Sequence, residues 1–340
     1  MTVPIEIPHT EWASTRSRLL RQALVTLAVP LVLTACGDTD STTSNEAGSS
    51  AGEPTGSAEQ FPVDVLSGSV DGGSEVTIDS RPESIVSMSP TATEVLWAIG
   101  ADDQVVAVDE QSDYPDDVPV TDLSAYNPNV EAVLEYEPDL VVLSHDMGDL
   151  VAGLDEADVP TLLLPVPEDF DELYSQIERA GAATGHAGEA AEVVSSMQSD
   201  IDDVLSEVPE REQPLTYYHE LDPSYYSITE DTFIGQTYAM VGMESIAEGD
   251  GSGQSPQLSA EHIVNADPDL IMLADTECCD VTPQSVTQRP GWEELSAVQN
   301  DQIHVLDEDV SSRWGPRVVD FVETLGTVAT KANTTASDGR

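Results

Sequence analysis

Basic residues are almost absent from this sequence. Its 340 residues include 11 Lys and Arg against 65 Asp and Glu, which gives a formal net charge of −54, and Lys331 is the only lysine. So few cations cannot neutralise nucleic-acid phosphates, which excludes DNA and RNA as partners. The acidity favours a solvated surface adapted to high salt, where cations screen self-repulsion, with a role in metal capture as the alternative.

Cysteine, long apolar runs and enzyme motifs are also scarce. Three cysteines, Cys36, Cys278 and Cys279, are too few to build a disulfide scaffold. No apolar run reaches the ~20 residues that a membrane-spanning helix needs. There is no phosphate loop, and no Gly-x-Ser-x-Gly elbow or Gly-x-Gly-x-x-Gly fingerprint joins a predicted strand to a helix. The Ser-His-Asp at 144–146 is contiguous, unlike a triad assembled in space. An α/β enzyme is therefore a weaker alternative.

Two stretches, residues 130–143 and 260–273, repeat one pattern, each residue of the second lying 130 positions after its counterpart. Each begins with a short helix that opens with a carboxylate, continues through a Pro-Asp pair, and ends in an apolar run. Such a run, short and without alternation, is typical of a parallel strand buried on both faces. The distance between the copies is far longer than a solenoid repeat, so we expect two similar α/β lobes.

The N-terminal segment predicts export and anchoring. Residues 1–36 combine a basic region, a short apolar region and the sequence Leu-Thr-Ala-Cys-Gly, which resembles a bacterial lipobox, so we expect a lipoprotein signal peptide with Cys36 as the lipid-modified residue. The alternative is an ordinary cleavage site that precedes a cysteine. Residues 37–60 are rich in Ser, Thr, Gly and Glu, which predicts a flexible, disordered tether.

The rest of the chain alternates strands and helices, which indicates parallel sheets with right-handed crossovers. We predict an N-terminal α/β lobe at 61–186, an inter-lobe helix at 187–209, a C-terminal α/β lobe at 210–330 and a flexible tail at 331–340. A hairpin around Asp71-Gly72-Gly73 opens the first lobe, and a helix from about Gly315 to Ala329 closes the second.

Several short motifs follow one another along residues 61–328. They are Ser89-Pro90-Thr91-Ala92-Thr93-Glu94, Ser112-Asp113-Tyr114-Pro115, Asn129-Val130-Glu131 with Pro138-Asp139-Leu140, Pro290-Gly291-Trp292, and Ser312-Arg313-Trp314-Gly315-Pro316-Arg317. In this order they resemble the helical-backbone (class III) substrate-binding proteins of ABC importers for iron chelates and cobalamin. The resemblance implies two Rossmann-like lobes, each with a central parallel sheet, joined by one long rigid helix around a ligand cleft.

Ligands of open parallel sheets bind beyond the carboxyl ends of the strands, and the loops there nominate a ligand site. For Tyr225 and Tyr226 a place in the core is the alternative. Arg313 either pairs with a carboxylate of the ligand or makes a salt bridge in an acidic neighbourhood, and Arg317 is more simply structural. The expected ligand-binding residues are Tyr114, Tyr126, His145, Tyr225, Tyr226, Arg313 and Trp314.

His145 and the pair Cys278-Cys279 follow the two repeated strands, which makes them weak candidates for ligating a metal. A disulfide between neighbouring cysteines is disfavoured, because adjacent Cα atoms lie ~3.8 Å apart, below the usual 4.4–6.8 Å of a disulfide. We expect no resident metal or cofactor.

Glu131 and Glu261 stand at matching points of the two repeats. Each is favourably placed at a helix N-terminus, but that does not explain why both copies carry one. In the resembled family, one surface glutamate per lobe pairs with arginines of the permease. The resemblance therefore implies that Glu131 and Glu261 dock the protein on a permease dimer.

Together these features predict a monomeric solute-binding lipoprotein, anchored by lipid to the outer face of the cell membrane. It would capture a ferric-siderophore-type iron chelate and deliver it to an ABC permease without covalent chemistry. Cobalamin and haem are the alternative ligands, and a tethered receptor or scaffold is a further alternative function. The shortage of arginine disfavours a highly anionic siderophore and favours a neutral hydroxamate or a corrinoid.

Overall fold

The computed structural model describes residues 61–247 and 254–338, and both lobes discussed below belong to one compact unit. The predicted signal peptide (1–36), the lipidation site Cys36 and the tether (37–60) lie outside the described residues. Within the described ranges, no helix is both long enough and apolar enough to cross a membrane.

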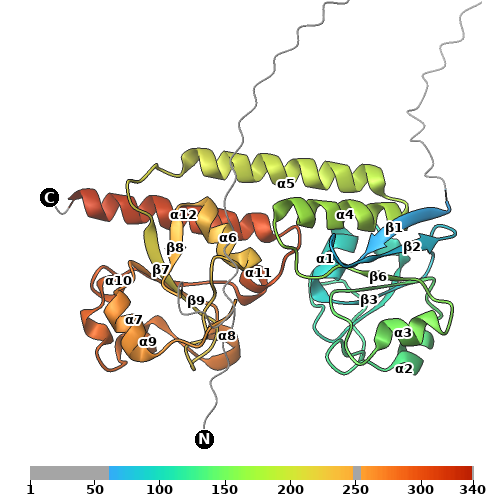
Figure 1. The fold of residues 1–340 in the computed structure, drawn as a ribbon, viewed down its shortest axis with the longest axis horizontal. Coiled ribbons are helices and arrows are strands. Elements are labelled where there is room, and N and C mark those ends of the chain that lie inside the picture. The colour runs from blue at the N-terminus through green and yellow to red at the C-terminus, as the bar shows by residue number, and fades with distance from the viewer. Residues whose placement is uncertain (1–60, 248–253, 339–340) are drawn as a thin grey trace, which may run out of the picture. The chain divides into compact units, whose positions relative to one another are not determined.

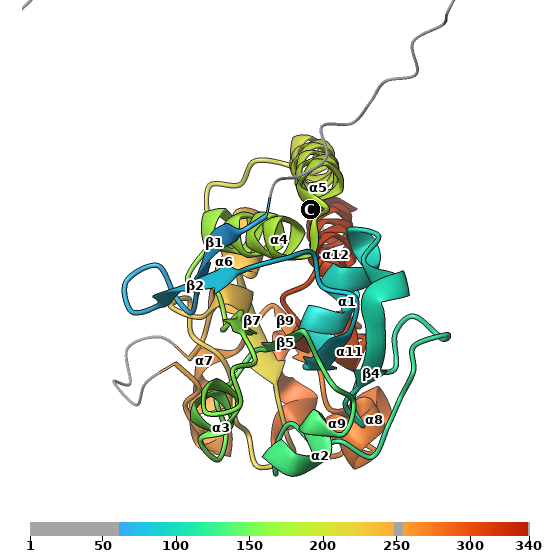
Figure 2. The same ribbon diagram turned by 90° about the vertical axis from the view of Figure 1, so that its right-hand side faces the viewer.

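The predicted hairpin is confirmed and opens the first lobe. Strands β1 (Val63–Ser67) and β2 (Ser74–Ile78) pair antiparallel, and β1 lies against helix α4 (Figure 2). The turn needs Gly73, because a Cβ there would lie 2.5 Å from the backbone oxygen of Ser67. The Ser67 hydroxyl accepts from Leu163 N and donates to Thr161 O, both at 2.9 Å, and so ties the hairpin to an edge strand of the lobe.

The N-terminal lobe is a four-stranded parallel sheet in the order β4-β3-β5-β6, flanked by helices (Figure 1). Its strands are β3 (Ile85–Met88), β4 (Val105–Val108), β5 (Leu140–Leu143) and β6 (Thr161–Leu163). Its helices are α1 (Pro90–Ala98), α2 (Val130–Leu134), α3 (Leu150–Asp155) and α4 (Phe170–Thr184).

The C-terminal lobe repeats this topology with the order β10-β9-β7-β8, again all parallel. Read in chain order, each lobe places its strands second, first, third, fourth, which confirms the predicted pair of similar α/β lobes. Its strands are β7 (Leu215–Glu220), β8 (Met243–Ser245), β9 (Leu270–Leu273) and β10 (Ile303–Val305). Its helices are α6 (Phe233–Met240), α7 (Ala260–Ala266), α8 (Thr276–Cys279), α9 (Pro283–Thr287), α10 (Ser296–Gln299) and α11 (Glu308–Ser312).

The duplication extends to single residues. Residues 131–143 and 261–273 have the same burial class at every position. β5 and β9 are inner strands, and their alternate side chains enter separate cores on the two faces of each sheet, which explains the unbroken apolar runs. The two Pro-Asp aspartates also act alike: Asp139 accepts from Ser84 N at 3.2 Å, and Asp269 accepts from Thr216 N at 2.9 Å. Each aspartate fastens its strand to the start of the neighbouring one.

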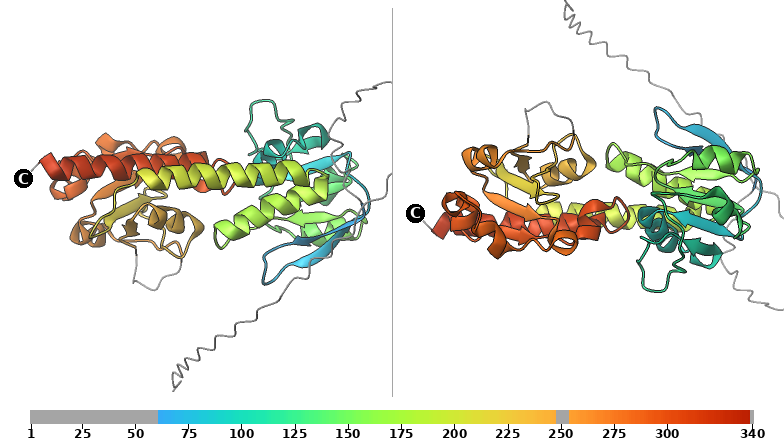
Figure 3. Two further views of the ribbon diagram at one scale, coloured as in Figure 1. Left: turned by 90° about the horizontal axis from the view of Figure 1, so that it is seen from above. Right: turned by 90° about the horizontal axis from the view of Figure 1, so that it is seen from below.

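Helix α5 (Ala187–Glu207) is the predicted inter-lobe helix and runs between the last helix of the first lobe and β7 (Figure 1). It packs on α4 and on α12 (Val318–Asp338), alongside which Figure 3 shows it. A Cβ at Gly326 of α12 would lie 2.6 Å from Val204 of α5, so the glycine permits this close approach. The final helix extends past the predicted end at Ala329. The prediction of a flexible tail is therefore wrong for residues 331–338, where no Gly or Pro interrupts the helix.

Candidate functional site

The carboxyl ends of the first-lobe strands carry a network of hydroxyl groups. Ser89 follows β3, is the N-cap of α1, and lies 2.6 Å (Oγ to Oγ) from Ser144, which follows β5. Beyond β4, Ser112 donates to Asp109 at 2.5 Å, and burial raises the pKa of that carboxyl although this hydrogen bond opposes the rise. β3 lies between β4 and β5, so these loops leave the sheet at the topological switch point where ligands of such folds bind.

A cavity of about 480 Å³ opens over this edge of the sheet. One wall comes from the loops after β3, β4 and β5, and the opposite wall from the segment 309–314 of the C-terminal lobe. The lining mixes apolar and sulfur-containing surfaces with a few polar groups, as small-molecule sites do. Of the predicted ligand-binding residues, the cavity is lined by Tyr126, His145, Arg313 and Trp314.

Trp314 joins the two lobes across this cavity. Its ring meets the ring of His145 edge-on, with centroids 6.0 Å apart and an interplanar angle of 74°. Trp314 also lines a second cavity of about 740 Å³, between residues 166–168 of the first lobe and 228–236 of the second. At that cavity Gln236 donates to Glu168 O at 2.6 Å. Trp314 therefore lies between two parts of one inter-lobe cleft.

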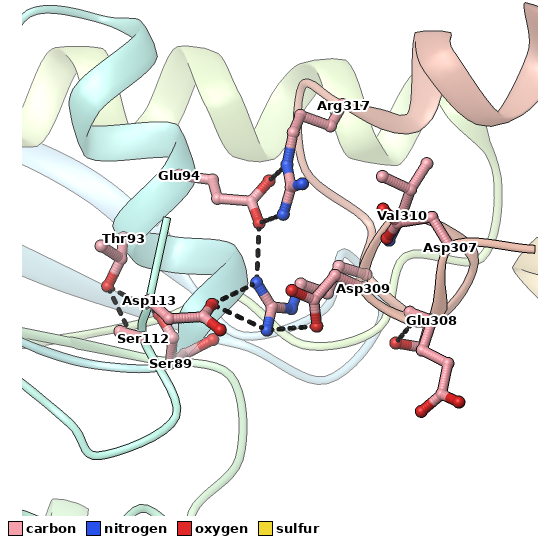
Figure 4. A network of polar contacts seen from close by, with 12 residues as sticks. Ser89, Thr93, Glu94, Ser112, Asp113, Asp307, Glu308, Asp309, Val310 and Arg317 are labelled. Atoms are coloured by element: carbon pink, nitrogen blue, oxygen red, sulfur yellow. Dashed lines mark hydrogen bonds and ion pairs between the residues drawn. The ribbon is translucent and has the colours of Figure 1, made fainter. Parts of the chain in front are cut away.

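Arg313 is held by three carboxylates, two of them from the other lobe. Figure 4 labels these carboxylates as Glu94, Asp113 and Asp309. Its guanidinium lies 3.2 Å from Glu94, 3.2 Å from Asp113 and 2.6 Å from Asp309, four residues before it. Its side chain is 13% exposed. The alternative interpretation of Arg313, a salt bridge in an acidic neighbourhood, is thus realised in the structure.

Arg317 meets the same buried glutamate. Its Nε and Nη2 donate to Glu94 at 3.0 and 2.5 Å, and these hydrogen bonds raise the pKa of the guanidinium further. The prediction that Arg317 is structural therefore agrees with its contacts. The guanidinium also lies 4.0 Å from the ring centroid of Tyr114, a cation–π contact. Tyr114 is 45% exposed and lies beside the 480 Å³ cavity's arginine network, not on the cavity lining.

The structure does not bring Tyr225 and Tyr226 to either of these cavities. Tyr225 packs beside Trp292 at a centroid distance of 5.9 Å, and Arg289 lies over both rings. Tyr226 forms an isolated β-bridge with Gln257 and is 40% exposed. For Tyr225 the contacts match the alternative interpretation, a place against the core of the second lobe.

A buried charged cluster occupies the corresponding edge of the second lobe. Glu220, at the end of β7, is fully buried and accepts from both terminal nitrogens of Arg289 at 2.5 and 2.6 Å. Asp275, two residues after β9, is also buried, and burial together with the charge of Glu220 raises its pKa to about 7. At the 130-residue offset the counterpart of His145 is Asp275. The expectation that Cys278 and Cys279 occupy the place equivalent to His145 is therefore corrected.

Cys278 and Cys279 form a disulfide within the exposed helix α8. The expectation that adjacency disfavours such a bond is therefore wrong for this pair, although their Cα atoms are 3.8 Å apart. The bond leaves neither sulfur as a thiolate for a metal. No cluster of three or more His, Cys, Asp or Glu residues suited to a metal occurs in 61–247 or 254–338.

Glu131 and Glu261 lie in the first turns of α2 and α7 and are both exposed. Capping is done by their neighbours, because Asn129 and Ser259 accept from the backbone at 3.2 and 3.0 Å. Within the described ranges neither glutamate side chain has a hydrogen bond or ion pair that would occupy it. Both carboxylates are therefore available to a partner.

Sequence reasoning missed the acidic half of the arginine network. Glu94, Asp113 and Asp309 come from three separate segments, and Glu94 lies 219 positions before Arg313. A signal was present, since Glu94 and Asp113 stand inside the first two motifs of the resemblance and Arg313 inside the last. In an acidic chain, however, no pattern singles out which carboxylates a given arginine meets.

Known proteins resemble this chain in sequence and in fold. A family model described as periplasmic binding protein matches residues 85–310. An uncharacterized ABC transporter substrate-binding lipoprotein of Bacillus subtilis, YvrC, is 32% identical over 277 residues, which cover 78% of this chain and 85% of the relative. A cobalamin-binding protein of Halobacterium salinarum is 28% identical over 260 residues, covering 72% and 69%.

Solved structures share the two-lobe fold. The periplasmic vitamin B12 binding protein BtuF of Vibrio cholerae superposes with a TM-score of 0.62 at 25% identity, covering 74% of this chain and 98% of its own. The periplasmic haem-binding protein RhuT of Roseiflexus sp. RS-1 does so with a TM-score of 0.65 at 22% identity, covering 74% and 99%.

Proposed function

Since the chain belongs to the periplasmic binding protein family, we propose that it is the solute-binding lipoprotein of an ABC importer and captures a near-neutral metal chelate of the cobalamin class. The family expected from the sequence motifs is confirmed. The ligand, the permease contact and the lipid anchor at Cys36 are our proposals. The relatives are binding proteins, and we assign the chain no catalytic step.

The observation that carries the choice of ligand is the charge of the cleft. Among the described residues that line the two cavities, Arg313 is the single arginine and there is no lysine. Its guanidinium already faces three carboxylates. An anionic chelate would meet no unpaired cation there, whereas a corrinoid with amide side chains brings no net charge and offers a broad ring surface to Trp314 and Tyr126. The cobalamin-binding relative supports the same choice.

A neutral ferric hydroxamate is the second candidate, because the same balance of charge favours it. A ferric catecholate and haem rank lower, since both bring anionic groups. In every case the ligand would lie against the loops after β3 and β5 and under Trp314. We assign it no covalent bond to the protein.

Delivery is assigned to Glu131 and Glu261. Each lobe presents one of these exposed carboxylates in the first turn of equivalent helices, and each lacks a partner in the described part of the chain. Two carboxylates on two similar lobes suit two arginine-bearing subunits of a permease dimer.

Tryptophan fluorescence titration of the mature protein tests the proposal. The panel is cyanocobalamin, a neutral ferric hydroxamate, an anionic ferric catecholate and haem. We expect sub-micromolar binding of cyanocobalamin, and quenching that falls strongly in Trp314→Phe. Tight binding of the catecholate or haem alone would contradict the choice of a near-neutral chelate.

A further inference from the structure

We propose that Glu94 sets the charge selectivity of the cleft by acting as an internal counter-anion. It neutralises Arg313 and Arg317 from behind the cavity wall and so excludes anionic chelates. The proposal rests on the proposed function, which it deepens by naming the residue that selects the ligand class. Glu94 is a positioning residue, since it does not line either cavity and acts through Arg313.

Glu94 engages both arginines at once. Its carboxylate lies 3.2 Å from Arg313 Nη1, 3.0 Å from Arg317 Nε and 2.5 Å from Arg317 Nη2. A Cβ at Gly315 would lie 3.2 Å from Glu94 Oε2, so the small residue between the arginines lets the loop approach the carboxylate. Figure 4 shows Glu94 and Arg317 facing each other from the two lobes.

Glu94 differs from the other two carboxylates of the network in burial. Its side chain is 2% exposed, against 66% for Asp113 and 41% for Asp309. Solvent and salt screen an exposed charge, but they screen a buried pair much less. Burial raises the pKa of Asp309, although the charge of Arg313 opposes the rise. The carboxylate whose charge solvent and salt screen least is therefore Glu94.

An anionic ligand could use Arg313 only by competing with this buried carboxylate. Removing the arginine from Glu94 would leave a desolvated charge with fewer partners, which is strongly unfavourable. A neutral ligand leaves the network intact. Without Glu94, the two arginines could form an anion site, because an arginine fork matches a carboxylate or phosphate in geometry. Together with Asp113 and Asp309, Glu94 sets three carboxylates against the two arginines, so this wall carries no net positive charge.

The test is the ratio of two dissociation constants on one scaffold. Cyanocobalamin is the neutral probe and dicyanocobyrinic acid, a corrinoid polycarboxylate, is the anionic probe. Glu94→Gln should shift the ratio toward the anionic probe by roughly tenfold, because one charge near the ligand is lost. Glu94→Asp keeps the charge and should keep the wild-type ratio. Arg317→Gln leaves Glu94 less neutralised and should shift the ratio the opposite way.

Glu220→Gln is the matched control. It removes a buried carboxylate that is also paired with arginine, but Glu220 and Arg289 line neither cavity. The ratio should not change in this variant. If Glu94→Gln does not fold, the opposite shift in Arg317→Gln carries the test.

The two proposals fail in different ways. Wild-type protein that binds the anionic probe as tightly as the neutral one contradicts the proposed function. If no corrinoid binds, a neutral ferric hydroxamate and an anionic ferric catecholate replace the pair. Wild-type discrimination that persists unchanged in folded Glu94→Gln, or in Arg317→Gln, overturns the role of Glu94.

Discussion

The two lobes share the packing and topology of their sheets and differ in the loops that follow the strands. Residues 131–143 and 261–273 are buried alike position by position, and β5 and β9 hold the same place in sheets of the same topology. Yet the residues that follow them diverge. Ser144 and His145 line the cavity, whereas their counterparts Ala274 and Asp275 do not. The repeat thus preserves the packing of each lobe, whereas the loops that follow it differ: the one after β5 lines the cavity and the one after β9 does not.

The end of the neighbouring strand in each sheet explains the difference. In register, Met88 of β3 lies beside Leu143, and Glu220 of β7 lies beside Leu273. Met88 lines the cavity, while Glu220 is buried in its pair with Arg289. The second lobe therefore closes this edge with an internal ion pair, and it lines the 480 Å³ cavity through the segment 309–314 instead.

The largest expected effect comes from the two equivalent glutamates, Glu131 and Glu261, one on each lobe. Combining Glu131→Arg with Glu261→Arg should reduce ligand uptake by cells to background, because both proposed permease contacts would become repulsive, while the affinity of the purified protein for ligand stays unchanged. Glu135→Arg with Glu244→Arg makes the same change in charge at other exposed sites and should leave uptake intact. Loss of ligand affinity in the first variant would refute docking as the cause.

Matching core positions should respond alike. Leu143→Ala and Leu273→Ala each remove a fully buried leucine from the same place in the two sheets. Each should lower the free energy of unfolding by about 2–5 kcal/mol, measured by denaturant titration. A large cost in one lobe with almost none in the other would break the equivalence of the two cores.

The charged cluster of the second lobe should make stability depend on pH. The pKa of Asp275 is about 7 in the folded protein, above its ordinary value of 3.8, because of burial and Glu220, with Glu308 adding to the rise and Arg289 opposing it. The folded state holds this proton more tightly, so its stabilising effect is complete below pH 3.8 and is lost as pH rises through 7.

Across that window stability should fall by up to about 1.4 kcal/mol per pH unit from this group. Thermal unfolding of the wild type and of Asp275→Asn between pH 4 and 8 measures the difference. The gap in Tm between the two proteins should change over this range. A constant gap would show that Asp275 titrates as an ordinary carboxyl.

The smallest expected effect concerns the paired aspartates. Asp139→Ala and Asp269→Ala each remove an acceptor that fastens neighbouring strands, and each should cost about 1 kcal/mol of stability. Asn at either site retains an acceptor oxygen and should recover part of the loss. Unequal costs would show that the two strand contacts are not equivalent.

The fold of the two lobes was predictable because its sequence signals are local. Apolar runs without alternation, Pro-Asp pairs and the hairpin turn each identify one strand, helix end or turn, and the constant offset of the repeat then implies two lobes. The site was predictable only in part. Trp314 and His145 could be nominated from strand ends, but Tyr225 stands at an equally suitable strand end and packs against Trp292 instead.

What the sequence could not supply are contacts between distant segments. Arg313 meets Glu94 across 219 positions, and with 65 acidic residues available no local pattern identifies the partner. The disulfide between Cys278 and Cys279 is a contact that local reasoning wrongly disfavoured. The usual range of Cα separations argued against this bond, but the structure forms it within a short helix.

A crystal structure of the protein with cyanocobalamin tests the account most directly. We predict a ligand seated over the loops after β3 and β5, in contact with Trp314, His145 and Tyr126, while Glu94 keeps its hydrogen bonds to Arg313 and Arg317. A ligand bound against Asp275 and helix α8, or one whose anionic group displaces Glu94 from Arg313, would contradict it.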